Sequence, residues 1–174
     1  TSESLSSLND GTLSAETPAA SAGETSYDYP NPRWALGVVS MSKFGPDPIA
    51  GLLTFVTLPF AEDTEITGPI LLELFASSSQ PDTDFIIKIS DQFPQSDDER
   101  AQGRQPKSAV VTKGWHKASH RDKDDQLSTK HRPYYMHEAP APMASGNVYK
   151  FEIEVHPTSH VFSTGHRLRL EIAN

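Results

Sequence analysis

The feature that most constrains this chain is the regular alternation of apolar and polar side chains in its last thirty residues. In residues 148–156 every second side chain is apolar: Tyr149, Phe151, Ile153 and Val155. In residues 166–172 the same holds for Leu168, Leu170 and Ile172. A period of two places successive side chains on opposite faces of a β-strand, one in the core and one in solvent. Both segments are therefore predicted to be half-buried strands.

Further strand signals lie upstream. Apolar runs at 52–58 and 70–76 are bounded by Gly and Pro, Phe85–Ser90 alternates again, Ser108–Lys113 is a weaker candidate, and Gly11–Ser14 is at most a short strand. Fourteen prolines oppose long helices, since a proline inside a helix costs about 3 kcal/mol. Short strands between proline-rich turns predict an all-β fold, an antiparallel β-sandwich.

The chain divides into two regions. Residues 1–26, rich in Ser, Thr, Ala, Gly and Glu, are predicted to be a linker or loosely ordered lead-in, and 27–174 form one domain. Turns are predicted at Tyr27–Pro32, at Gly68–Pro69 between two strands, at Pro81–Asp84 and at Pro157–His160. Gly165 is expected to supply the backbone shape that lets the last strand pair.

The net charge of −8 is unevenly distributed. Residues 1–99 carry 3 basic and 16 acidic side chains, net −13, whereas residues 100–132 carry 9 and 3, net +6. The acidic total gives no reason to expect nucleic acid or a membrane surface as a partner. The basic block is interpreted as a solvated loop or, alternatively, as a patch that docks an acidic neighbouring domain or steers an anionic ligand.

The location of the protein is weakly constrained. There is no cysteine, so disulfides, thiolate nucleophiles and Cys-ligated zinc are excluded. This usage fits a cytoplasmic protein and does not exclude a secreted one. The longest apolar stretch, around 51–60, is too short to span a bilayer, and the first ten residues lack the basic start and apolar run of a signal peptide.

Motifs for catalysis or metal binding are weak. No two glycines lie four positions apart, so the Gly-x-Ser-x-Gly turn of a serine nucleophile is absent, as are Gly-rich phosphate loops. His116 and His120 share a spacing that joins imidazoles only on a helix, and no His-x-His pair exists, so metal binding is the weakest alternative. Ser159 and His160, with Asp63, Asp82 or Asp84, could form a catalytic triad. A structural role for Ser159 and His160 is favoured over this triad. No cofactor is expected.

Two predicted loops mix aromatic and cationic residues. One carries Trp115, His116, His120 and Arg121, and the other carries Tyr134, Tyr135 and His137. Exposed aromatic rings of this kind occur in sugar-binding β-sandwiches, but Trp and Tyr more often anchor a loop to its own domain or to a partner. A free-standing module that binds carbohydrate or another small ligand is therefore the alternative function.

Three stretches in order, 58–70, 77–89 and 156–172, resemble the C-terminal domain of the cocaine esterase-like (CocE/NonD) hydrolases. X-Pro dipeptidyl-peptidases and α-amino-acid ester hydrolases of peptidase family S15 share that domain. The segments GWHKASHR (114–121) and RPYYMHEAP (132–140) are similar to the intervening loops of one branch. The resemblance covers about residues 27–174.

The resemblance implies a jelly-roll β-sandwich, similar to galactose-binding domains, that packs on the α/β-hydrolase catalytic domain of the same polypeptide and shapes its substrate pocket. The catalytic serine, acid and histidine then lie upstream, so this chain alone is expected to be inactive towards an ester, amide or X-Pro peptide. The family continues through one more strand, so the chain is expected to lack its last strand and to leave its final edge open. Arg167 and Arg169 are expected to pair with carboxylates of the catalytic domain. The full set of candidates for the substrate pocket or the domain interface is Trp115, His116, His120, Arg121, Tyr134, Arg167 and Arg169.

Overall fold

The structure is a computed structural model that describes residues 11–13, 16–17, 19, 23–26, 34–36, 39–42, 45–47, 53–102, 104 and 106–173. Almost all regular structure within these ranges is β-strand. The helices are α1 (Asp97–Ala101) and the 3-10 turn η1 (Ala118–His120). Among the described residues, no helix has the length and apolar character needed to cross a membrane.

One large sheet carries most of the chain. Its strands, in spatial order, are β1 (Gly11–Thr12), β5 (Leu53–Val56), β10 (Arg167–Ala173), β7 (Asp84–Gln92), β8 (Ser108–Lys117), β9 (Tyr149–Phe162) and β6 (Thr64–Ala76). All neighbours are antiparallel except β1 and β5. A second antiparallel sheet has the order β2 (Trp34–Leu36), β3 (Val39–Ser42) and β4 (Gly45–Asp47).

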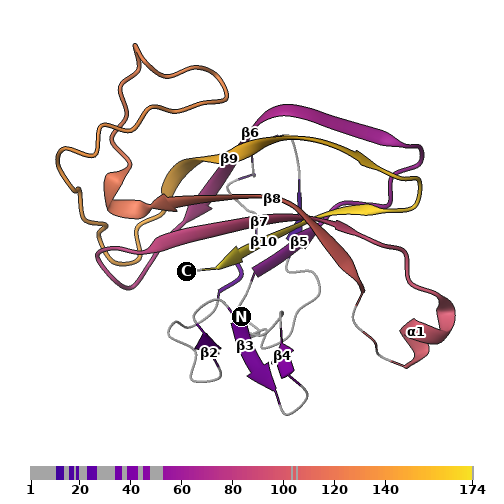
Figure 1. Cartoon of the computed structure of the whole chain (residues 1–174). Helices are drawn as coiled ribbons and strands as arrows, with labels where there is room; N and C mark the ends of the chain where they lie inside the picture. Colours follow the sequence, from indigo (N-terminus) through magenta and orange to yellow (C-terminus); the bar gives the residue numbers. More distant parts are fainter. Residues whose placement is uncertain are drawn as a thin grey trace.

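The large sheet curls where β8 meets β9. These strands pair at one position, Gly114 with Val155, and the long β6–β9 pair lies over β8, β7, β10 and β5 (Figure 1). A Cβ atom on Gly114 would lie 2.5 Å from the carbonyl oxygen of Glu154. Because side chains leave no room for such an approach, a glycine is required at this crossing.

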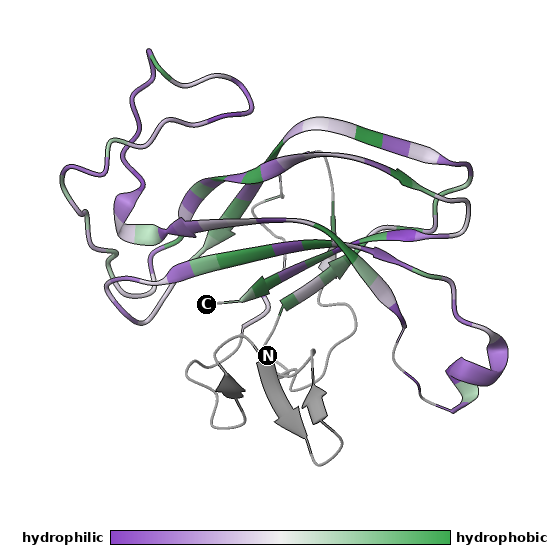
Figure 2. Ribbon diagram, viewed as in Figure 1, coloured by the Kyte–Doolittle hydropathy of each residue, from purple (hydrophilic) through white to green (hydrophobic). Residues whose placement is uncertain are grey.

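The core lies inside the curl. Its fully or nearly fully buried members come from the strands with alternating patterns: Phe85, Ile87 and Ile89 of β7, Phe151, Ile153 and Val155 of β9, and Leu170 and Ile172 of β10. In Figure 2 apolar and polar residues alternate along β9, while β7 carries an apolar stretch. Burying each of these side chains contributes about 1.5–3 kcal/mol. The predicted strands and the all-β, antiparallel fold class are confirmed; the likeness to galactose-binding domains stays a prediction.

Two predicted turns are wrong. Gly68–Pro69 lies inside β6, and Pro157–His160 lies inside β9. Gly68 pairs with Thr158 and Ile70 with Val155, so the ladder is irregular between these pairs. Pro69 and Pro157 both fall in this irregularity, where a proline without an N–H group disturbs no regular ladder bond. Two prolines that look like strand ends are thus placed at one bulge.

The last strand of the chain does not form an open edge. β10 pairs with β5 on one side and with β7 on the other, so it is an interior strand. The absence of a closing strand stays a prediction. Gly165, just before β10, has φ of 82°, a left-handed conformation that favours glycine, in the turn that joins β9 to β10. The predicted turn at Tyr27–Pro32 lies outside the described residues, and so does most of 1–26.

Candidate functional site

The sequence candidates between Trp115 and Tyr134 gather at the end of β8. This strand runs into η1, and the connection 121–148 then loops outward before it returns as β9 (Figure 1). Asp82 fastens η1 to the sheet. Its carboxylate accepts hydrogen bonds from the backbone N–H of Ser119 (2.9 Å) and from the Ser119 hydroxyl (2.8 Å), and Lys117 Nζ lies 2.8 Å away. Burial raises the pKa of Asp82, but these contacts outweigh it and lower the pKa to about 2.

His116 lies on the inner face of β8 and is 6% exposed. Its ring packs between Tyr135, at 4.6 Å between centroids, and Phe151, at 5.9 Å. Burial, with smaller effects from His137 and His120, lowers the pKa of His116 to about 4, so the ring is neutral at pH 7. A buried neutral imidazole contributes to the core, and it presents no edge to a substrate.

His120 and Arg121 hold the connection in place. The Nδ1 atoms of His120 and His137 lie 2.8 Å apart, so one ring donates the hydrogen bond and the other accepts it. His137 has φ of 55°, a left-handed backbone uncommon outside glycine. The Arg121 guanidinium donates to the carbonyl oxygens of Ala118 and Ala141 and stacks 4.7 Å from the Tyr149 ring. Arg121 and the two histidines therefore join segments of their own domain.

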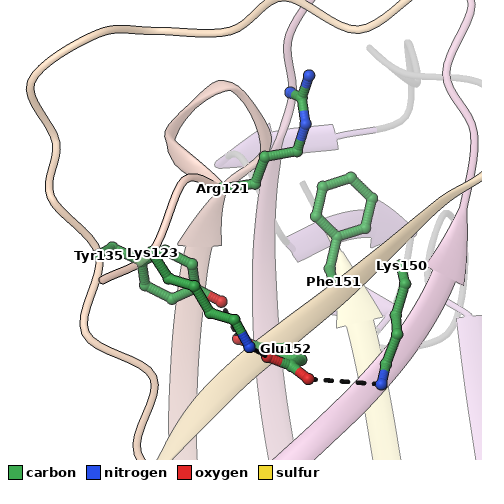
Figure 3. A pocket seen from close by; sticks show the side chains of 6 residues that line it. All are labelled: Arg121, Lys123, Tyr135, Lys150, Phe151 and Glu152. Atoms are coloured by element: carbon green, nitrogen blue, oxygen red, sulfur yellow. Dashed lines mark hydrogen bonds and ion pairs between the residues drawn. The ribbon is translucent and has the colours of Figure 1, made fainter. Parts of the chain in front are cut away.

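A cavity of about 220 Å³ opens beside this cluster, lined by Arg121, Lys123, Tyr135, Lys150, Phe151 and Glu152. Lys123 and Lys150 converge on Glu152, while the Arg121 guanidinium points away from them (Figure 3). The hydrogen bond from Lys123, supported by Lys150, lowers the pKa of Glu152 despite its burial. Tyr135 donates to the carbonyl oxygen of Glu152, and burial together with the Glu152 charge raises the pKa of Tyr135 to about 12. The lining is an internally paired set of charges, with no nucleophile beside a base.

Trp115 and Tyr134 are the exposed candidates. The Trp115 side chain is 65% exposed on the outer face of β8, and its ring meets that of His156 at 5.0 Å, edge to face. Tyr134 is 52% exposed in the 121–148 connection, where its backbone bonds to Asp124 and Ser128.

Arg167 and Arg169 lie on β10, away from this cluster. Arg167 donates to the carbonyl oxygen of Thr57 (2.7 Å). Arg169 is 3% exposed, and its Nη2 lies 2.8 Å from Glu171 Oε1. Their role towards a catalytic domain stays a prediction, although the Arg169 guanidinium is already engaged by its own strand.

The less favoured triad is not assembled. Ser159 and His160 are adjacent in β9, so their side chains point to opposite faces, and the Ser159 hydroxyl accepts a bond from Thr67 (3.0 Å). His160 Nε2 contacts Asp91 Oδ2 (3.1 Å), while His166 Nδ1 contacts Asp91 Oδ1 (2.8 Å). Sequence reasoning missed this His–Asp–His cluster, because its members come from three strand ends with no shared motif.

Metal binding has no candidate group in the described part of the chain, where no three His, Cys, Asp or Glu side chains are placed to hold an ion. The basic block is largely neutralised by the domain itself. Five of its nine cations form ion pairs with carboxylates of the domain: Arg100, Lys107, Lys117, Lys123 and Arg132.

Known proteins contain regions similar to this β-domain. In an alignment of 178 positions the chain is 27% identical to the cocaine esterase of a Rhodococcus species. The alignment covers 97% of this chain and 27% of that protein. The chain is 28% identical over 129 residues to a protein of Mycobacterium tuberculosis named as a serine esterase, covering 71% of this chain and 19% of that protein. The chain thus spans about a fifth to a quarter of these relatives.

Solved structures share the fold. A CocE/NonD family hydrolase from Staphylococcus aureus superimposes with a TM-score of 0.59 at 24% identity, over 70% of this chain and 22% of that one. An α-amino acid ester hydrolase gives a TM-score of 0.55 at 25% identity, over 78% of this chain and 20% of that one. The model of the X-Pro dipeptidyl-peptidase C-terminal non-catalytic domain matches residues 1–173. The chain therefore belongs to this family of non-catalytic domains, as its sequence resemblance had indicated.

Proposed function

We propose that this chain is the C-terminal β-domain of a serine hydrolase that cleaves acyl esters, amides or X-Pro peptides, and that it packs on an α/β-hydrolase catalytic domain of the same polypeptide. The observation that carries the proposal is the family match along residues 1–173, in a chain that spans only 19–27% of its relatives. The absence of Gly-x-Ser-x-Gly from the sequence supports a catalytic serine elsewhere. There the serine would attack the carbonyl and water would hydrolyse the acyl-enzyme.

Within such an enzyme the 121–148 connection is the part best suited to form a wall of the substrate pocket. It extends from the sheet, carries exposed Tyr134, and is fixed at its base by Arg121 and by the His120–His137 hydrogen bond. Buried His116 packs beneath the start of this connection, inside the core, and does not contact substrate in this proposal.

The cavity gives no support to carbohydrate binding. Its aromatic members are Tyr135, whose hydroxyl is bound to Glu152, and buried Phe151. A sugar ring needs an open aromatic face on which to stack. The cavity lining offers none.

The proposal is tested by hydrolysis of p-nitrophenyl acetate by the full-length polypeptide. Replacing the serine of an upstream Gly-x-Ser-x-Gly by alanine is expected to lower kcat by about 10⁴-fold or more. The matched variant Ser159→Ala removes the serine beside His160 and should leave kcat within about two-fold, because Ser159 touches no reacting group in this proposal. Loss of hydrolysis in Ser159→Ala, with the upstream variant fully active, would overturn the proposal.

A further inference from the structure

The outer face of the large sheet, opposite the core, is occupied unevenly. The strand register places five rows on this face, from Arg167, Gln92 and Ser108 at one end to Asp84 and Lys117 at the other. The three middle rows are Val56, Arg169, Ser90 and Val110; Thr54, Glu171, Lys88 and Lys113; and Ala173, Ile86 and Trp115. The β8 side chains of these middle rows are Val110, Lys113 and Trp115, which we call the β8 face.

Burial changes abruptly along these rows. On β5, β10 and β7 the face is mostly buried, since Thr54 and Ser90 are 0% exposed and Arg169 and Glu171 are 3% exposed. Its remaining members on these strands are Ala173, which is buried, and the half-buried Val56, Ile86 and Lys88. On β8 it is bare, with Val110 at 54% and Trp115 at 65% exposed and Lys113 exposed as well. A tryptophan left largely in water on a rigid strand, beside an exposed valine, is typical of a surface that another protein covers.

The charges of the β8 face point to the chemistry of its partner. Lys88, one strand inward, is paired with Glu171 (2.6 Å), and Lys117, at the end of β8, is paired with Asp82 (2.8 Å). Lys113 has no carboxylate within ion-pair distance among the described residues. The indole N–H of Trp115 and the ammonium of Lys113 are donors, so the complementary surface is apolar with a carboxylate or carbonyl acceptor.

We propose that the β8 face is the surface on which this domain docks to the catalytic domain of its own polypeptide, with Trp115 as the central anchor and Lys113 paired to a carboxylate at the rim. The inference rests on the proposed function. The relatives are more than three times as long as this chain, so the remainder of such a polypeptide is attached to this domain and can act as its partner.

The size of the face favours this occupant over a second copy of the chain. A stable association between separate molecules buries about 1,200–2,000 Å², whereas a tryptophan contributes at most about 250 Å². Three β8 side chains are too few for a free dimer. Attachment through the backbone supplies a millimolar effective concentration, at which such a small contact is sufficient.

The experiment is hydroxyl-radical footprinting of the full-length polypeptide with peptide mapping by mass spectrometry. Leu58 is the internal reference, because it is 81% exposed and follows β5, outside both the β8 face and the 121–148 connection. After correction for intrinsic reactivity, Trp115 is expected to be oxidised roughly ten-fold more slowly than Leu58, since the centre of an interface excludes water. Measurement over a hundred-fold dilution separates the occupants, because intramolecular protection does not change with concentration.

The possible results separate docking through the β8 face from the proposed function on which it rests. Protection of other surfaces of the domain with Trp115 fully reactive would leave the proposed function standing and overturn the β8 face. A domain with no protected surface would overturn both. Protection of Trp115 that disappears on dilution would assign the face to a second copy and contradict the inference.

A charge reversal provides an independent measure. Lys113→Glu in the full-length polypeptide is expected to raise the rate of proteolysis between the domains about ten-fold, because the rim carboxylate is then repelled. Arg104→Glu is the matched control, since Arg104 is exposed in the segment between α1 and β8, outside both the β8 face and the 121–148 connection; it should leave that rate unchanged. Equal effects of the two reversals would count against the proposal.

Discussion

The two ends of the curled sheet hold their histidines in opposite ways. At the η1 end, His116 is buried between aromatic rings, and His120 contacts His137 through two ring nitrogens. At the other end, near the turn from β9 to β10, His160 and His166 each contact an oxygen of the same carboxylate, Asp91. One end therefore contains imidazoles whose partners are rings, and the other contains imidazoles that share one carboxylate.

Histidine therefore stabilises the two ends of this β-domain through two kinds of contact, with rings at one end and with a carboxylate at the other. Protonation of buried His116 would place an uncompensated charge in the core, which is costly. The Asp91 end depends instead on a buried acceptor that must remain available to two donors. Each end is thus broken by a different change.

The largest effect is expected from Gly114→Val at the crossing. Its Cβ would lie 2.5 Å from the carbonyl oxygen of Glu154 and 3.0 Å from Val155 Cα, and backbone atoms cannot yield to it. The substitution should lower the free energy of unfolding by more than about 4 kcal/mol, measured by urea denaturation followed by circular dichroism. Gly23→Ala, where nothing lies within 4 Å, is the control and should be neutral. A stable Gly114→Val protein would show that the two strands can separate.

The η1 end is expected to fail in acid. The pKa of His116 is lowered to about 4 by burial, whereas an unfolded histidine titrates near 6.5, so the unfolded chain binds the extra proton between these values. Stability is therefore full above pH 6.5 and decreases as the pH falls to about 4, by up to about 3 kcal/mol. His116→Phe should remove this part of the pH dependence, and His131→Phe, at an exposed position, should retain it. Equal slopes in both variants would contradict the prediction.

The opposite end is tested by Asp91→Ala. This change deprives His160 and His166 of their acceptor in a site where Asp91 is 5% exposed, and should cost about 2–3 kcal/mol of unfolding free energy. Asp91→Asn keeps the shape and one acceptor, so a smaller loss is expected. Asp97→Ala, at a side chain 98% exposed, is the control. An Asp91→Ala protein as stable as the control would remove the basis of the comparison between the ends.

The smallest effect concerns the fastening of η1 by Asp82. Its pKa is lowered to about 2, so its contribution is present above the unfolded value of 3.8 and is lost as the pH falls toward about 2. With the side chain about a third exposed, solvent screening limits the contribution to about 1–2 kcal/mol. The stability difference between the wild type and Asp82→Asn should therefore shrink from pH 5 to pH 2. Asp125→Asn, at an exposed turn, should show no difference at either pH.

The strands and the fold class could be predicted because burial on one face of a strand leaves a direct trace in sequence. The full lengths of β6 and β9 could not be predicted, because Pro69 and Pro157 suggest turns. Only the pairing of the two strands shows that both prolines lie in one bulge. The helix α1 begins with a capping box, Ser96 to Glu99, which is a local signal in the sequence. The His–Asp–His cluster joins Asp91 to residues 69 and 75 positions away, for which a single sequence holds no signal. The sequence indicates Trp115 as an interface candidate, but only the strand register shows that its face is buried on the neighbouring strands.

The proposed function places the catalytic serine outside this chain. Fluorophosphonate labelling of the full-length polypeptide, followed by peptide mapping, locates that serine, because the reagent modifies only an activated serine. We expect one labelled serine, upstream of residue 1 in a Gly-x-Ser-x-Gly, and none within residues 1–174. A label on Ser159, or on any other serine of this chain, would contradict this placement.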